Sequence, residues 1–232
     1  MPVYCNSLTA EYLCRCGVAD AGRYKIFSTG SSFTIQDIDV HAFYIPHDAV
    51  DPVAFVLSSD YGSVGFLTDL GYAPKLARER IREVHTLVVE TNHDEKRLQA
   101  DPKRPWSVKQ RILSRHGHLS NEAAAGLVAD IAGENLRRVV LGHLSRERNS
   151  PELALNAMRQ LGLDSLEFYC AEQDQVSPQF QIGSQALARA QRQDIRLKTG
   201  CLAVSEKVNP VAGSHDDEQH AEYLLNLGWH VR

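Results

Sequence analysis

The pattern of hydrophobic and polar positions changes its period along this chain. Residues 7–16 have apolar side chains at helical spacing and predict a helix that ends before Gly17. Between residues 24 and 68 the apolar runs are short and β-rich, and Gly, Asp, Pro and Ser separate them. Alternation in the run DIDVHAFYI predicts a strand with His47 just past its end. A hairpin turn is predicted at residues 61–63, between VAFVLSS and VGFLT.

After residue 71 the chain alternates between helical and buried-strand patterns. Helices are predicted at residues 74–83, 105–114, 120–131 and 151–162, and buried strands at residues 86–90, 138–142 and 165–170. Mixed strands followed by strand–helix alternation predict a layered α/β fold whose helices lie outside the sheet. We expect this domain to cover residues 1–183. A terminal extension, residues 184–232, is expected to be partly helical or mobile.

Composition narrows the class of protein. Hydrophobic residues make up 43% of the 232 residues and charged residues 23%, as in an ordinary soluble globular protein. The net charge of −4 gives no bulk electrostatic reason for nucleic-acid binding, so a nucleic acid would have to bind at a local basic patch. No apolar run approaches the ~20 residues of a membrane span, and the first residues do not resemble a signal peptide. Five cysteines without a CxxC pair favour reduced thiols, so we expect a cytoplasmic protein with no membrane partner.

Five short segments place metal-competent polar side chains where α/β sheets usually build sites, just past strand ends. They are PHDA (46–49), TDLG (68–71), ETNHD (90–94), GHLSN (117–121) and GHLS (142–145). Each segment alone is typical of a hydrogen-bonded histidine, a turn aspartate or a helix cap. Because all five segments carry such residues just past a predicted strand end, a shared site is favoured over five unrelated ones. Imidazoles and carboxylates suit zinc or manganese, and a pair of such ions can turn a shared water into hydroxide at neutral pH.

Longer runs around these segments resemble a known family. The runs are PHDA-x-DPVAFVL, FLTDLG, ETNHD, RILSRHGHLSNEAA and VVLGHLSRERNSPELA. They resemble the YycJ (WalJ) family of metallo-β-lactamase-fold hydrolases over roughly residues 1 to 180. They are similar, more distantly, to the PhnP phosphodiesterases and the tRNA 3′-processing ribonuclease Z group. The resemblance implies an αββα sandwich and a metal-dependent phosphodiesterase or nuclease, in which a metal-activated hydroxide attacks a phosphodiester.

The resemblance also implies roles for particular residues. Two divalent metals, zinc or manganese, would be held by His47, Asp69 and His143, with Asp69 as the bridging carboxylate. His118 would help to protonate the leaving group as the catalytic residue. Four further residues match a family segment near the site: Glu90, Asn92, His93 and Asp94. Residues that bind the substrate are not identified by this pattern.

One family signature has no counterpart in this sequence. Members of the superfamily carry His-x-His-x-Asp-His on a loop after an early strand, and no segment here matches it. We therefore expect a partial αββα sandwich that is truncated at its N-terminus and lacks the first strands and this loop. Catalytic zinc normally keeps three protein ligands and a water. His47, Asp69 and His143 are too few for two such ions, so metal binding by this chain alone is expected to be weak or absent.

Three functional interpretations follow. The chain is part of a metal-dependent hydrolase whose true start lies upstream, or an inactive fragment or subunit that needs another chain for the missing half-site, or an α/β binding module that uses no metal. Exposed strand edges would allow a partner chain or self-association. The substrate is a nucleic acid or a small phosphodiester. The basic stretch 102–116, which contains Trp106, either meets a phosphate backbone or forms an amphipathic helix with a solvated cationic face.

Overall fold

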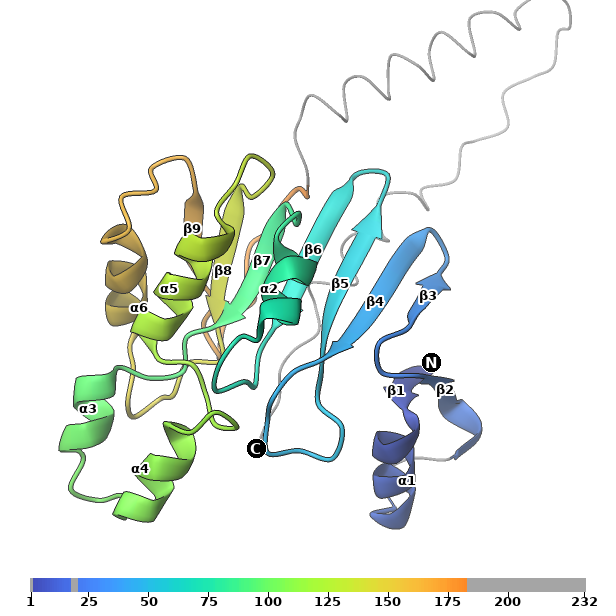
Figure 1. The fold of residues 1–232 in the computed structure, drawn as a ribbon, viewed down its shortest axis with the longest axis horizontal. Coiled ribbons are helices and arrows are strands. Elements are labelled where there is room, and N and C mark those ends of the chain that lie inside the picture. The colour runs from blue at the N-terminus through green and yellow to red at the C-terminus, as the bar shows by residue number, and fades with distance from the viewer. Residues whose placement is uncertain (1, 18–20, 183–232) are drawn as a thin grey trace, which may run out of the picture.

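A seven-stranded mixed sheet forms the centre of the molecule (Figure 1). The computed structural model describes residues 2–17 and 21–182, so the extension expected at residues 184–232 lies outside the described residues. The strands follow one another across the sheet in chain order: β3 (Ser32–Ile35), β4 (Ile38–Tyr44), β5 (Val53–Ser59), β6 (Gly62–Leu67), β7 (Thr86–Glu90), β8 (Arg138–Gly142) and β9 (Glu167–Cys170). This sheet, flanked by helices, confirms the predicted α/β class.

The strand directions bring several strand ends to one edge of the sheet. Strands β4 and β6 are both antiparallel to β5, so they run in the same direction. Strands β7, β8 and β9 continue parallel to β6. The carboxyl ends of β4, β6, β7 and β8 therefore meet at the same edge. Loops that follow these four strands can build a common site there.

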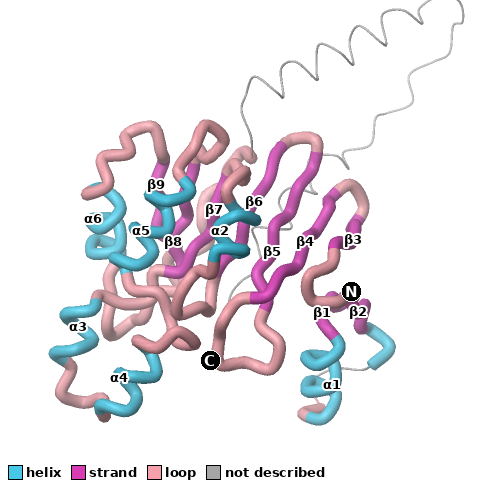
Figure 2. Tube along the Cα trace, viewed as in Figure 1, coloured by secondary structure: helices cyan, strands magenta, loops and turns pink. Residues whose placement is uncertain are grey.

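Helices cover one face of the sheet. These helices are α2 (Lys75–Ile81), α5 (Asn121–Ile131) and α6 (Pro151–Arg159) (Figure 2). Their apolar sides pack on the strands, and Ile81, Leu87, Val128, Leu141 and Met158 have no exposed surface. Two short helices, α3 (Glu95–Ala100) and α4 (Trp106–Ile112), lie beyond the sheet edge that receives the strand ends. They are therefore placed beside the loops rather than over the core.

A small N-terminal unit packs against β3 and the loop that joins β4 to β5. It consists of β1 (Val3–Asn6), α1 (Ser7–Arg15), a 3-10 turn (Ala21–Arg23) and β2 (Tyr24–Phe27), with β1 and β2 parallel to each other. Tyr4 and Phe27 both stack on Phe33 of β3, with ring centroids 5.3 and 5.1 Å apart. The Asn6 amide donates to the carbonyl of Asp51 at 2.8 Å. Aromatic stacking and this hydrogen bond therefore fix the unit against the strands.

The predicted helices and strands are found in the structure, but some of their first and last residues differ from the prediction. The helix predicted at residues 7–16 and the strands predicted at 86–90 and 138–142 are confirmed as α1, β7 and β8. The hairpin predicted between VAFVLSS and VGFLT is confirmed, but its turn consists of Asp60 and Tyr61 and not of residues 61–63, because Gly62 already pairs with Ser59. Helix α3 was not predicted, since it is only six residues long.

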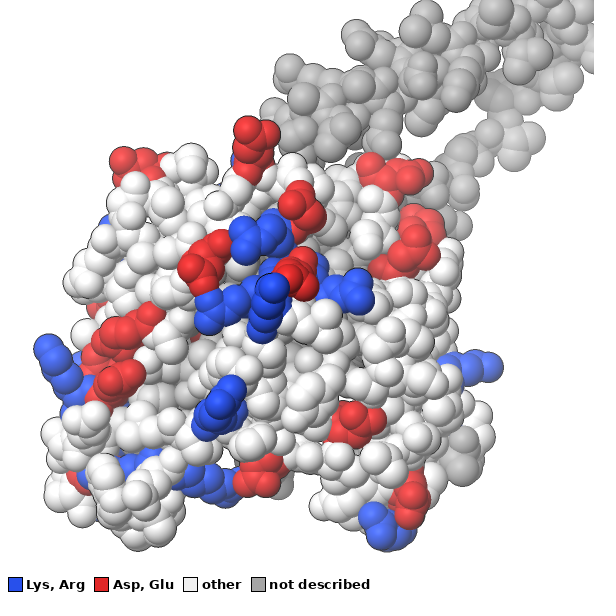
Figure 3. Space-filling view, in the orientation of Figure 1, with Lys and Arg blue, Asp and Glu red and all other residues white. Residues whose placement is uncertain are grey.

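Charged side chains on the helical face are mixed in sign. Lys and Arg are interspersed with Asp and Glu over α2 and α5, as the space-filling view shows (Figure 3). Lys75 pairs with Glu79 one turn away, and Arg78 of α2 pairs with Asp130 of α5. This face therefore offers no single-sign surface to a nucleic acid. Among the described helices, none has the length and hydropathy needed to cross a membrane.

Burial divides the described cysteines into two classes. Cys5 and Cys170 are buried, whereas Cys14 and Cys16 are exposed. Burial, with smaller contributions from Glu172 and Glu152, raises the pKa of Cys170 to about 11. Because the thiolate is the reactive form, iodoacetamide at pH 8 should modify Cys14 and Cys16 and leave Cys170 unmodified until the protein unfolds. Peptide mapping by mass spectrometry measures this, and equal labelling of Cys170 would contradict the burial.

Candidate metal centre

Four strand ends deliver the side chains of the candidate site. Asp69 lies two residues after β6, Glu90 is the last residue of β7, and His143 directly follows β8. His47 follows β4 by three residues. His118 comes from the segment between α4 and α5. The common direction of these strands explains why residues so far apart in the sequence reach one place.

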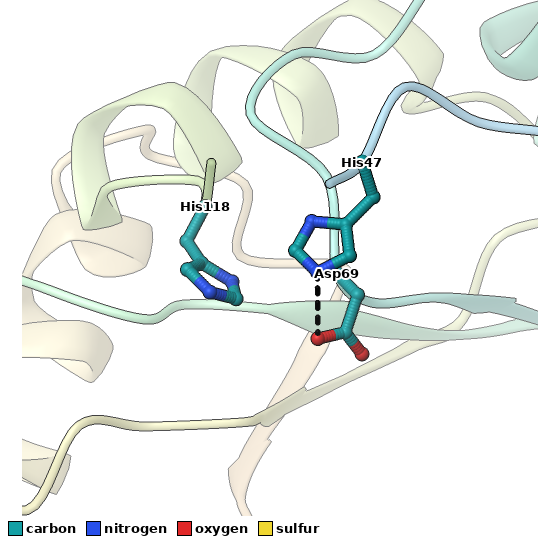
Figure 4. Close-up of side chains that lie close together, drawn as sticks. All are labelled: His47, Asp69 and His118. Carbon is teal, nitrogen blue, oxygen red and sulfur yellow. Dashed lines mark ion pairs between the residues drawn. The ribbon is translucent and has the colours of Figure 1, made fainter. Parts of the chain in front are cut away.

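Asp69 lies between two imidazoles. Its Oδ1 atom is 3.7 Å from Nε2 of His47 and 3.5 Å from Nε2 of His143. Figure 4 shows His47 and Asp69 pointing toward each other, with the His118 ring beside them. The His118 ring centroid is 5.1 Å from that of His47 and 5.2 Å from that of His143. The structure thus brings all four side chains together, and their roles as ligands or proton donor stay predictions.

The backbone is held in a left-handed conformation at two of these residues. Asp69 has φ 61° and His143 has φ 56°, values that residues other than glycine rarely adopt. Of the three described non-glycine residues with positive φ, only Gln36 lies away from the site. Such conformations cost of order 1–3 kcal/mol each and cluster at functional sites. The sharp turn after β6 and β8 is what aims both side chains at one point.

Glu90 anchors two of the imidazoles. This carboxylate has no exposed surface, and its Oε1 accepts from Nδ1 of His118 at 2.6 Å and from Nδ1 of His143 at 3.0 Å. Its Oε2 accepts from the backbone N–H of Leu70 at 3.1 Å. Burial alone would raise the pKa of Glu90, but the hydrogen bonds and charges of both histidines lower it. Glu90 is therefore ionised and fixes the orientation of both rings.

The anchors also decide which ring nitrogen is free. Nδ1 of His47 lies 3.1 Å from the carbonyl oxygen of Gly117, which can only accept, so Nδ1 carries the proton. Glu90 holds the Nδ1 protons of His118 and His143 in the same way. Burial alone would lower the pKa of His143, but the Glu90 hydrogen bond and the nearby carboxylates raise it. In the neutral rings Nε2 keeps its lone pair, which is the arrangement found in metal-binding histidines.

The donor set fits a divalent cation. Ligand atoms of His47, Asp69 and His118 all lie within 4.8 Å of one another. A second group of the described residues, Glu90, His118 and His143, meets the same criterion. Glu90 is nevertheless poorly suited as a ligand, because it is buried and its oxygens already accept three hydrogen bonds. The free atoms that face one another are imidazole Nε2 atoms and one carboxylate, which suit zinc or manganese.

Two glycines allow the site loops to pack closely. A Cβ atom at Gly71 would overlap the backbone of Ser114 and Arg115, and a Cβ atom at Gly117 would overlap the carbonyl of Ile112. The loop that carries Asp69 therefore packs directly on the chain that leaves α4. This contact sets the position of His118. Any larger residue at either glycine would push these loops apart.

The NHD segment (Asn92–Asp94) connects the site loops rather than lining the ion site. The Asn92 side chain donates to the carbonyl of His143 at 3.1 Å, and its backbone carbonyl accepts from Ser145 at 2.8 Å. His93 is buried and forms an isolated bridge with Ser120. Asp94 caps α3 by accepting from the N–H of Arg97 at 2.8 Å. The Asp94 side chain therefore acts as the N-cap of α3.

The basic stretch predicted to meet a phosphate backbone is divided by the fold. Arg104 and Arg111 line a cavity beside His118. Lys109 is buried, and its ammonium donates to the carbonyl of Gln99. Trp106 is 61% exposed and is not among the residues that line this cavity. Only part of the stretch therefore faces the site.

Comparison with known proteins gives a family match and close relatives. The model of the beta-lactamase superfamily domain matches residues 1–144. Exodeoxyribonuclease YycJ of Bacillus anthracis is 35% identical over 164 residues, which cover 69% of this chain and 61% of that protein. The chain thus spans less than two thirds of the length of this relative.

Solved structures share the fold at lower identity. The metallo-β-lactamase-fold protein YhfI of Bacillus subtilis matches with a TM-score of 0.54 and 13% identity, over 74% of this chain and 61% of that chain. Zinc-bound PqqB of Methylobacterium extorquens matches with a TM-score of 0.53 and 16% identity, over 74% and 63%. At these identities the likeness shows the fold alone.

Proposed function

Because the chain belongs to the beta-lactamase superfamily and has a metallo-β-lactamase fold with YycJ-like motifs, we propose that it is a metal-dependent phosphodiesterase of the nuclease type. The observation that carries this proposal is the convergence of His47, Asp69 and His143, with both imidazole Nε2 atoms within 3.7 Å of one carboxylate oxygen. The name of the YycJ relative, an exodeoxyribonuclease, supports a phosphodiester of DNA as the substrate.

His47, Asp69 and His143 are the residues that would hold two divalent cations, with Asp69 between them. When bound, such cations lower the pKa of water and neutralise charge on a phosphate. Zinc is favoured by the imidazole ligands and by the zinc-bound PqqB neighbour. Three side chains are fewer than two catalytic ions require. We propose that the remaining ligands come from outside the described residues, in the same protein or in a partner chain.

His118 is the proposed proton donor to the leaving oxygen. Its Nδ1–H is held by Glu90 at 2.6 Å, and its ring centroid lies 5.1 Å from that of His47 and 5.2 Å from that of His143. A carboxylate at Nδ1 stabilises the protonated ring, which can then release the proton on Nε2. Glu90 keeps the ring from rotating while the bond to the leaving oxygen breaks.

The test uses the purified full-length protein, with any partner chain that co-purifies, added zinc or manganese, and two substrates, bis(p-nitrophenyl) phosphate and a labelled DNA oligonucleotide. Turnover should require the metal and disappear with a chelator. His118→Ala should lower kcat by about 10²–10⁴-fold, the usual contribution of a general acid, and should leave the metal-induced rise in Tm unchanged. His41→Ala is the matched control, because this imidazole lies within β4 and contacts Ser32 instead.

Turnover that persists in metal-free protein would contradict the proposal. The alternative is an inactive chain or a subunit that needs another chain. The shortage of metal ligands favours this alternative over a binding module that uses no metal. Absence of turnover with either metal and either substrate would support that alternative. Loss of the metal-induced rise in Tm in the His47, Asp69 and His143 variants would still exclude a module that uses no metal.

A further inference from the structure

A cavity lies between the candidate metal centre and the two short helices. Its volume is about 330 Å³, within the range of small-molecule sites. His47 and His118 form the side toward the metal centre. Leu98 of α3 and Val108 and Ile112 of α4 form an apolar wall. The cavity is therefore continuous with the place where a phosphodiester would be cleaved.

His93 contributes an unusual polar group to this cavity. It is 1% exposed, and neither of its ring nitrogens has a hydrogen-bond partner among the residues that the structure describes. Leaving a buried polar group unpaired normally costs 1–3 kcal/mol, so such a group requires an explanation. Burial lowers the pKa of His93, which keeps the ring neutral. A neutral imidazole offers one donor and one acceptor to a ligand.

Charges at the rim of the cavity are already paired. Arg111 forms a salt bridge with Asp48 at 2.8 Å, and Asp48 lines the cavity as well. Arg104 and Arg148 both pair with Asp101 and Glu147. A second phosphate would have to compete with these carboxylates. The cavity is therefore better suited to a neutral group with apolar faces and polar edges.

We propose that this cavity holds the nucleoside, base and sugar together, next to the scissile phosphate, with His93 hydrogen-bonded to it and Val108 packed on it. The inference rests on the proposed function, because it places a nucleotide substrate at the metal centre. A nucleobase has the required apolar faces, which pack on aliphatic side chains, and polar edges, which pair with the imidazole. In this proposal the ring nitrogens of His93 lack partners in the free protein because their hydrogen-bond partner is the bound nucleoside.

Binding of 2′-deoxyadenosine 5′-monophosphate to the metal-free full chain tests this inference. The dissociation constant and the shifts of the His93 ring signals would be measured by NMR, with inorganic phosphate and ribose 5-phosphate as reference probes. We expect the nucleotide to bind more tightly than either reference and to shift the His93 signals. Binding of phosphate as tight as that of the nucleotide would overturn the inference, because the cavity would then be an anion site.

Two variants separate a binding role from a structural one. His93→Phe should weaken nucleotide binding by about 3–10-fold, the value of one hydrogen bond, while Tm stays the same or rises because an unpaired buried group is removed. Val108→Trp fills the cavity and should weaken binding by at least about 10-fold. Gln110→Ala changes an exposed residue of α4 that does not line the cavity and is the control.

Unchanged nucleotide binding in both His93→Phe and Val108→Trp would overturn the inference. A fall in Tm of His93→Phe without weaker binding would also overturn it, since the ring would then be structural. Nucleotide binding without any metal-dependent turnover would leave the cavity assigned and contradict the proposed function. Metal-dependent turnover without nucleotide binding would support the proposed function and overturn the assignment of the cavity.

Discussion

Asp69→Asn should lower kcat/KM for phosphodiester hydrolysis by about 10³-fold or more and should remove the zinc-induced rise in Tm. The carboxylate lies between His47 and His143, at 3.7 and 3.5 Å from their Nε2 atoms, so it is the one anionic group common to both proposed ion positions. An amide oxygen carries no charge and bridges two cations poorly. Loss of several kcal/mol of charge stabilisation corresponds to such a decrease in rate.

Asparagine is the informative replacement at this position. It adopts left-handed backbone more readily than most residues, so the φ of 61° at Asp69 should be kept. The fold should therefore survive, with a change in unfolding free energy within about 0.5 kcal/mol. Metal content by mass spectrometry and kcat/KM measure the effect. Asp39→Asn, in β4 and hydrogen-bonded to Thr34, is the control. Full metal content and activity in Asp69→Asn would contradict the bridging role.

Glu90→Ala should lower the free energy of unfolding by about 3–5 kcal/mol, the usual cost of removing one member of a buried charged cluster. Glu90 has no exposed surface and accepts hydrogen bonds from His118, His143 and the N–H of Leu70. Its removal leaves two imidazole N–H groups and one amide without an acceptor. Urea unfolding measures the loss.

Glu90→Gln separates charge from shape. A glutamine oxygen in the place of Oε1 can still accept from both imidazoles, but the amide N–H₂ then stands in the place of Oε2 and cannot accept from the N–H of Leu70. The unfolding free energy should fall by about 1–3 kcal/mol, and metal affinity or kcat by about 10–100-fold, as for other groups that orient ligands. Unchanged activity in Glu90→Gln would show that the negative charge of Glu90 is not required beside the two rings.

Local sequence determined which elements form and which residues follow them. The apolar runs TLVVE and RVVLG predicted β7 and β8 with their observed bounds, because strands that are covered on both faces are continuously apolar. Ser120 predicted the start of α5, and it caps that helix by accepting from the N–H of Ala123. In the same way, polar residues directly after strands predicted that Asp69 and His143 belong to a site. The YycJ-like motifs predicted the family.

The sequence could not show how these residues meet. Glu90 is one position of an apolar strand. Its pairing with Gly142 of β8 places it beside His143, and the segment between α4 and α5 brings His118 to the same carboxylate. Residues 102–116 were predicted as one basic stretch that contains Trp106, yet the packing of α4 turns Arg111 toward the cavity and leaves Trp106 outside it. Which side chains of a helix face a site depends on the elements against which the helix packs.

Local patterns in the sequence were therefore enough to predict the α/β class, the family and the polar residues that follow the strand ends. These depend on local pattern, namely side-chain period, capping and turn chemistry, which are properties of neighbouring residues. Tertiary structure alone decided the free nitrogen of each imidazole, the left-handed backbone at Asp69 and His143, and the unpaired ring of His93. These depend on contacts between segments far apart in the sequence, such as His47 with Gly117, which is 70 residues away, and no local pattern specifies them.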